Sequence, residues 1–118
     1  MRPFVIHSLE DARAALTAAE RGVPVTLESA PAAGVHGGAA WFERMIAAAH
    51  AEFPQIPLRA VLDCGDAPGA VLEAVRWLKE PGRAKVALRF TGDAATAARL
   101  ADIASQAGIE LVREAAAV

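Results

Sequence analysis

Residues 60–69 read Ala60-Val61-Leu62-Asp63-Cys64-Gly65-Asp66-Ala67-Pro68-Gly69, and this stretch decides the fold class. An apolar run ends here in two carboxylates, a cysteine and two glycines, and an amphipathic pattern follows. That order indicates a buried strand that leads through a polar loop into a helix. In α/β proteins such loops lie at the carboxyl edge of a parallel sheet, where ligand sites are found. The stretch therefore predicts a fold class and the place of a site.

Strand-like and helix-like patterns alternate along the chain on both sides of this stretch. Strands are predicted at 4–7, 23–28, 58–63, 84–90 and 109–113. Helices are predicted at 8–21, 39–53, 68–80 and 93–107, and a loop rich in proline, glycine and alanine at 29–38. The order βαβαβαβαβ predicts an α/β fold with one five-stranded parallel sheet and right-handed crossovers.

Two arrangements of this sheet are open: a flavodoxin-like sheet with strand order 2-1-3-4-5, and a half-barrel-like one. A flavodoxin-like fold has a fifth helix that covers part of one sheet face, and we expect that helix to be lacking here. In the fourth predicted strand Leu88 and Phe90 share one face, whereas Lys85 and Arg89 point to the other. Strands buried on both faces are apolar throughout, so this alternation predicts one partly open face. We expect that face to meet a second copy, as a homodimer, or another partner.

Composition narrows the class of protein. A chain of 118 residues forms one compact domain, and 54% hydrophobic residues argue against disorder. A net charge of −2 without a basic cluster argues against nucleic acid as a partner. The single cysteine excludes an intrachain disulfide. No signal peptide or membrane-spanning run is recognisable, so we expect a soluble cytoplasmic protein of bacterial type that needs no cofactor.

The polar side chains expected at the carboxyl edge form a candidate crevice. In the order 2-1-3-4-5 the topological switch lies between the first and third strands, which would bring the end of one beside the end of the other. Ser8 and Asp66 are also predicted helix N-caps, and Pro68 suits the first turn that follows. No spacing predicts a metal site, but a small anion is a possible ligand. The candidate residues are His7, Ser8, His36, Asp63, Cys64, Asp66 and Thr91.

Cys64 and the segment before the second helix each allow two interpretations. Cys64 could be a nucleophile, with its pKa lowered by a helix N-terminus and His7 as its base, or a small buried side chain, which is the commoner case. The segment Gly34-Val35-His36-Gly37-Gly38 could approach an anion with its amides or serve as a flexible connector. Trp41 and Trp77 lie at the spacing of buried helix faces.

Asp63 and Thr91 occupy positions that resemble those of the phosphorylated aspartate and the hydroxyl residue in response-regulator receiver domains. The resemblance implies phosphoryl transfer to Asp63. The chain departs from that pattern at Ile6-His7-Ser8, where a magnesium-binding acidic pair is expected, and at Arg113, near the position of an expected lysine.

The stretch 61–69, together with Ala98-Arg99-Leu100-Ala101-Asp102-Ile103-Ala104, resembles small α/β proteins of alphaproteobacteria to which no activity is assigned. The likeness covers most of the chain and implies a small cytoplasmic α/β protein, with no functional residue carried over. We therefore expect a non-catalytic domain that self-associates or binds a partner. The alternative is an enzyme or small-anion binder that uses the carboxyl ends of the first and third strands.

Overall fold

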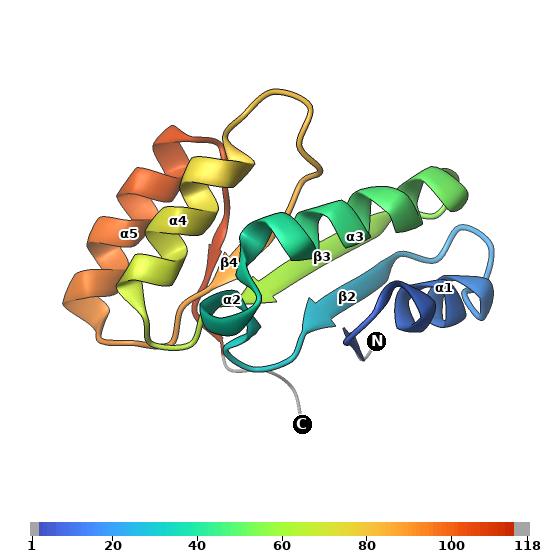
Figure 1. Cartoon of the computed structure of the whole chain (residues 1–118), viewed down its shortest axis with the longest axis horizontal. Helices are drawn as coiled ribbons and strands as arrows, with labels where there is room; N and C mark the ends of the chain where they lie inside the picture. Colours follow the sequence, from blue (N-terminus) through green and yellow to red (C-terminus); the bar gives the residue numbers. More distant parts are fainter. Residues whose placement is uncertain (1–2, 115–118) are drawn as a thin grey trace.

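Parallel strands alternate with helices along residues 3–114, the part of the chain that the computed structural model describes (Figure 1). The strands are β1 (Phe4–Ile6), β2 (Val25–Ser29), β3 (Leu58–Asp63), β4 (Ala87–Arg89) and β5 (Leu111–Val112). The helices are α1 (Leu9–Thr17), α2 (Ala33–His36), α3 (Gly38–Glu52), α4 (Pro68–Leu78) and α5 (Ala94–Gln106). The predicted α/β fold with a five-stranded parallel sheet is confirmed. The helix expected to be lacking after the fifth strand would fall partly on residues 115–118, outside the described residues.

The strands lie side by side in chain order, β1-β2-β3-β4-β5. The flavodoxin-like order 2-1-3-4-5 is therefore wrong. β1 pairs with β2 through Phe4 and Leu27, and the other side of β2 pairs with β3 through Leu27 and Ala60. Every crossover steps in the same direction across the sheet, as in a (β/α) barrel. The half-barrel-like arrangement, which the sequence left open as the second possibility, has its strands in this chain order.

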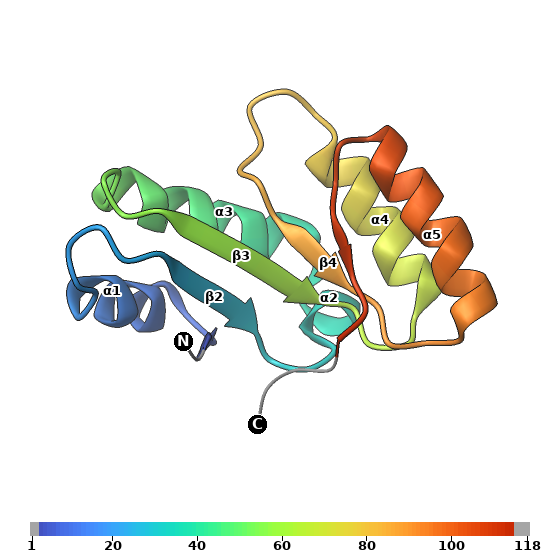
Figure 2. The same cartoon turned by 180° about the vertical axis from the view of Figure 1, so that it is seen from behind.

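All the connecting helices of the described chain form one layer on a single face of the sheet. Right-handed crossovers that step in one direction require this placement. In the layer α1 packs against α3, α3 against α4, and α4 against α5. The core between the two layers joins central strand residues such as Leu27, Leu62 and Leu88 to Phe42 of α3 and Val71 of α4. Seen from behind, β2, β3 and β4 lie in front with no helix over them (Figure 2). The predicted open face is present.

Side chains cap the starts of two helices, and one of these caps, Ser8, is a predicted one. The Ser8 hydroxyl accepts a hydrogen bond from the Asp11 amide (3.1 Å) at the start of α1, and the Asp93 carboxylate accepts one from Thr96 (3.0 Å) at the start of α5. The prediction that Asp66 caps α4 is wrong. Its N-cap is Ala67, without a side-chain hydrogen bond, and Pro68 provides the first turn. A proline at that position needs no amide partner, so the helix begins without a polar cap.

The predicted loop at 29–38 contains the short helix α2. Ala32 precedes it with a φ of 58°, an unusual conformation for a residue with a side chain. The Ala32 amide donates to the Asp63 carboxylate (3.0 Å), which holds this backbone from the neighbouring strand. Gly34 lies so close to β3 that an added Cβ would be 2.9 Å from Cys64 Sγ. Because these partners come from a distant part of the sequence, local composition gave no signal for α2.

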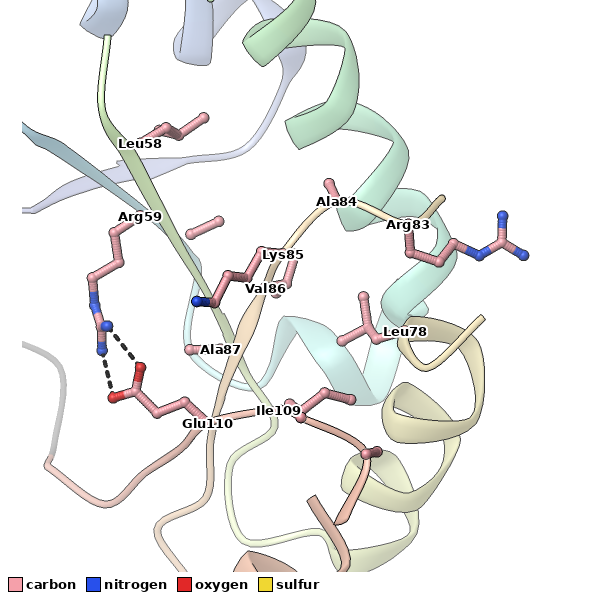
Figure 3. A pocket seen from close by; sticks show the side chains of 13 residues that line it. Leu58, Arg59, Leu78, Arg83, Ala84, Lys85, Val86, Ala87, Ile109 and Glu110 are labelled. Carbon is pink, nitrogen blue, oxygen red and sulfur yellow. Dashed lines mark hydrogen bonds and ion pairs between the residues drawn. The ribbon is translucent and has the colours of Figure 1, made fainter. Parts of the chain in front are cut away.

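Charged side chains shield the uncovered face of the sheet. Val61 and Ala87 lie in its middle and are only 2% and 7% exposed, although no described helix packs on them. Arg59 of β3 reaches over β4 to Glu110, with Nη1–Oε1 and Nη2–Oε2 distances of 2.7 and 3.1 Å (Figure 3). Nearer the carboxyl edge, Arg89 of β4 reaches over β3 to β2. The face is therefore polar at its surface and apolar only beneath these side chains.

Candidate functional site

The predicted crevice between the first and third strands is absent, because β2 lies between β1 and β3. The candidate residues divide into two groups at the carboxyl edge. One group follows β1 and β2 and consists of His7, Ser8 and His36. The other follows β3 and β4 and consists of Asp63, Cys64, Asp66 and Thr91, tied together by bonds such as Thr91 amide to Gly65 carbonyl (2.8 Å). Chemistry that joins His7 to Asp63 or Cys64 has no geometric basis.

Asp63 is used as a structural anchor. Its Oδ1 accepts hydrogen bonds from the amides of Ala32 (3.0 Å) and Gly65 (2.8 Å), and its own amide donates to Ser29 Oγ (2.9 Å). Its Oδ2 lies 3.4 Å from Nη1 of Arg89. Gly65 has a φ of +57°, so the turn needs both this glycine and the carboxylate that receives its amide. The Asp63 carboxylate, predicted as a crevice residue, closes the β3 turn and fixes α2.

Cys64 is a packing residue. Its side chain is fully buried against Gly34, and burial raises the pKa of the thiol to about 12, with the nearby Asp63 charge adding to the effect. A thiol with that pKa is protonated at neutral pH and is a poor nucleophile. The packing interpretation of Cys64 agrees with this environment.

Glu28, Asp63 and Arg89 form a buried ionic cluster on the uncovered face. Their exposed fractions are 3%, 6% and 5%. Arg89 donates to Glu28 Oε1 and Asp63 Oδ2 through its two terminal nitrogens, and to the Glu114 carbonyl (2.8 Å) through Nε. Glu28 Oε2 is buried without a hydrogen-bond partner among residues 3–114. Two carboxylates and one guanidinium leave one formal negative charge in the cluster.

Sequence reasoning missed this cluster, although the alternation in β4 placed Arg89 on the open face. The signal was available in the register, because Asp63 pairs with Arg89 once β3 and β4 are neighbours. Glu28 joins them because β2 lies on the other side of β3. Finding the cluster therefore required placing β2, β3 and β4 side by side in that order.

A pocket of about 470 Å³ lies beside the other group, at the carboxyl edge of β1 and β2. His7 and His36, which are 29 positions apart in the sequence, both line it. Trp41 of α3 lines it too and is 40% exposed, so its predicted place in the buried helix face is wrong. Its other lining residues are Ile6, Ala30, Pro31, Ala33 and Gly37.

A second hollow, of about 370 Å³, lies at the opposite edge of the sheet. Figure 3 shows Arg59, Lys85 and Glu110 on one side of it and Leu78 and Ile109 on the other. It is formed by the amino ends of β3, β4 and β5, whereas ligand sites of parallel α/β sheets lie at the carboxyl ends. We interpret this hollow as part of the charged sheet face.

Residues 3–114 contain no group of three or more His, Cys, Asp or Glu side chains placed to hold a metal ion. Within the same residues, no helix has the length and apolar character needed to cross a bilayer. No family model matches the chain, and no similar protein was found among curated sequences or solved structures. The function therefore has to be argued from the geometry of the molecule.

Proposed function

We propose that this chain is a non-catalytic domain that associates with a second copy through the uncovered face of its sheet. The observation that carries the proposal is the distribution of charge on that face. At the amino ends of the strands Arg59 and Lys85 outweigh Glu110 by one positive charge, and at the carboxyl ends Glu28 and Asp63 outweigh Arg89 by one negative charge. A two-fold axis that lies in the plane of the interface, perpendicular to the strands, would place the basic end of one copy over the acidic end of the other. Closed dimers use such self-complementary surfaces.

One exposed charged group on this face is available to a second copy. Lys85 is exposed and takes part in no ion pair within the described chain. Glu28 Oε2, at the other end, is the buried oxygen that lacks a donor. Because this oxygen is buried, Glu28 would act on a second copy through its charge and not through direct contact. Complementary charge of this kind gives an interface its register and specificity.

The face is large enough for a dimer contact. The molecule measures 40 × 33 × 24 Å, and its shortest dimension crosses the helix layer and the sheet (Figures 1 and 2). A stable interface covers roughly 800 Å² on each partner. The broad side of the molecule provides that area. Because the apolar residues of the face are already shielded, we expect a weak dimer that depends on salt.

The alternative, catalysis or anion binding between the first and third strands, has less support. Cys64 is buried with a raised pKa, Asp63 is held by four hydrogen-bond contacts, and His7 lies across β2 from both. A nucleophile and base need to lie within hydrogen-bond reach of each other.

Sedimentation equilibrium over a range of concentrations tests the proposal. We expect a monomer–dimer equilibrium that weakens when salt rises from about 0.05 M to about 0.5 M. Lys85→Glu should abolish the dimer, because it places a negative charge opposite Glu28 and Asp63. The matched control is Lys79→Glu, which makes the same change in the helix layer at the end of α4. These two residues are the only lysines of the chain.

Amine labelling gives an independent measurement. At dimer-forming concentrations an amine-reactive ester should modify Lys85 more slowly than Lys79, and dilution should remove the difference. A monomeric mass at all concentrations up to hundreds of micromolar would contradict the proposal. So would a dimer that forms equally well in Lys85→Glu and Lys79→Glu.

A further inference from the structure

The pocket at the carboxyl edge of β1 and β2 is separate from the proposed dimer face. Its walls come from the ends of these strands, from α2, and from Trp41 on α3, which belongs to the helix layer. Carboxyl-edge pockets are the usual ligand sites of parallel α/β sheets. At about 470 Å³ it lies within the size range of small-molecule sites. It could be occupied whether or not the chain forms a dimer.

An exposed indole forms one wall. Trp41 is 40% exposed, and its ring lies close to Gly37 in the turn before α3. A Cβ added to Gly37 would lie 3.1 Å from Cε3 of Trp41, so a larger residue would push the ring away from the turn. The other lining residues apart from the histidines have small or aliphatic side chains. A flat aromatic surface of this kind favours a planar ligand.

Two imidazoles are the polar side chains of the pocket. His7 comes from the end of β1 and His36 from the end of α2, and no carboxylate lines the pocket. Asp11 holds His7 from outside: its Oδ2 accepts the His7 amide (2.8 Å) and lies 3.6 Å from Nδ1 of the ring. The 3.6 Å approach of Asp11 is too long for a hydrogen bond, so no hydrogen bond within residues 3–114 occupies the His7 ring nitrogens. Imidazole N–H groups donate hydrogen bonds, and protonated imidazoles attract negative charge.

We propose that this pocket binds a small aromatic carboxylate. Its ring would lie against Trp41, and its carboxylate would accept hydrogen bonds from His7 and His36. The convergence of an exposed indole and two imidazoles from three different elements supports this ligand class, because the indole selects a planar group and the imidazoles select an acceptor.

Benzoate is the probe that tests the proposal, with ¹H–¹⁵N NMR of the wild-type protein as the measurement. The chain has two tryptophans, so two indole N–H signals are expected. Benzoate should shift the Trp41 signal with a Kd on the order of 1 mM, as for other fragments of this size. The Trp77 signal should stay in place, since that indole donates to Glu43 (3.1 Å) in another part of the helix layer. Benzyl alcohol lacks the charge and cyclohexanecarboxylate lacks the planar ring, and both should bind at least fivefold more weakly.

Substitutions on the exposed rim of the pocket separate binding from folding. His7→Gln and His36→Gln should each weaken benzoate binding at least fivefold, as read from the Trp41 signal, while an unchanged Trp77 signal shows that the fold is intact. Trp41→Leu should weaken it as much, as read from the backbone amide signal of Gly37, which lines the pocket. His50→Gln is the matched control, because His50 is the third histidine of the chain and does not line the pocket. The proposal is overturned by a Trp41 signal that does not move at about 20 mM benzoate. It is equally overturned if benzyl alcohol binds as well as benzoate, or if His36→Gln binds like His50→Gln.

Discussion

Arg89 on β4 reaches across β3 to hydrogen-bond Glu28 on β2, and both side chains are buried on the face of the sheet that no described helix covers. The pair lies beside Asp63, which also contacts Arg89. Ionic side chains thus take the place that a second helix layer has in doubly wound sheets. This relationship explains how a two-layer domain keeps its central strand residues shielded.

Removing the Arg89 guanidinium should destabilise the fold. Arg89→Met would leave Glu28 and Asp63 buried without their cation, which we expect to lower the free energy of unfolding by about 3–5 kcal/mol. Urea denaturation measures the change. The control is Arg59→Met, which breaks an ion pair whose side chains are 48% and 53% exposed. That variant should lose less than about 1 kcal/mol, because exposed pairs contribute little. Equal losses would show that the buried cluster is not a stabilising element.

Gly34 and Cys64 should be energetically coupled. Gly34→Ala would place a Cβ 2.9 Å from Cys64 Sγ and 3.2 Å from the Asp63 carbonyl oxygen, and should destabilise the fold by about 1–3 kcal/mol. Adding Cys64→Ala removes the sulfur contact and should recover part of the loss in a double-mutant cycle. Gly69→Ala is the control, since nothing lies within 4 Å of a Cβ there and the site is helical. Additive losses from Gly34→Ala and Cys64→Ala would argue against the contact.

The raised pKa of Cys64 predicts a loss of stability in alkali. The folded thiol has a pKa of about 12 against an ordinary value of 9.0, so between these pH values the folded state binds more protons than the unfolded state. The free energy of unfolding should therefore fall as pH rises from about 9 to about 12. Urea midpoints measured across this range for the wild type and Cys64→Ala isolate the contribution of the thiol. The variant has no thiol, so this part of the pH dependence should be missing from it.

The same pKa predicts slow alkylation of Cys64 at pH 8. Iodoacetamide should react at a rate that follows unfolding and that rises steeply with urea. Fast reaction in the native protein, slowed by His7→Ala, would instead restore the nucleophile hypothesis.

Substitution of Asp93 should lower the thermal stability more than substitution of Asp66, although each residue precedes a helix. Asp93→Ala should lower the thermal midpoint, because the Asp93 carboxylate accepts the Thr96 amide, whereas Asp66→Ala should leave it nearly unchanged, since α4 has no side-chain cap. The hydrogen bond from Thr96 lowers the pKa of Asp93. Its stabilising effect is thus present above the ordinary carboxyl pKa and lost as pH falls through the folded one. The difference between the two variants should therefore shrink in acid, which a thermal melt series from neutral pH downwards would show.

The sequence predicted which polar residues lie at the carboxyl edge of the sheet, but it did not predict which of them lie next to one another. The ends of β1 and β3 carry His7 and Asp63 as expected from their apolar runs. Their separation by β2 depends on the direction in which the first crossover steps, and no local pattern encodes that direction. Trp41 shows the same limit, because its spacing fits a buried helix face while its exposure depends on how α2 and Gly37 pack beside it.

The sequence by itself determined the kinds of element apart from α2, their parallel arrangement and the open sheet face. These follow from burial periodicity, from Ser8 as a helix cap, and from the alternation of Leu88 with Arg89, all of which are local. Tertiary structure decided the strand order, the structural use of Asp63 and Cys64, and the two groups at the carboxyl edge. It decided these because hydrogen bonds between residues 26 to 61 positions apart, such as Asp63–Arg89 and Glu28–Arg89, exist only after the strands are neighbours.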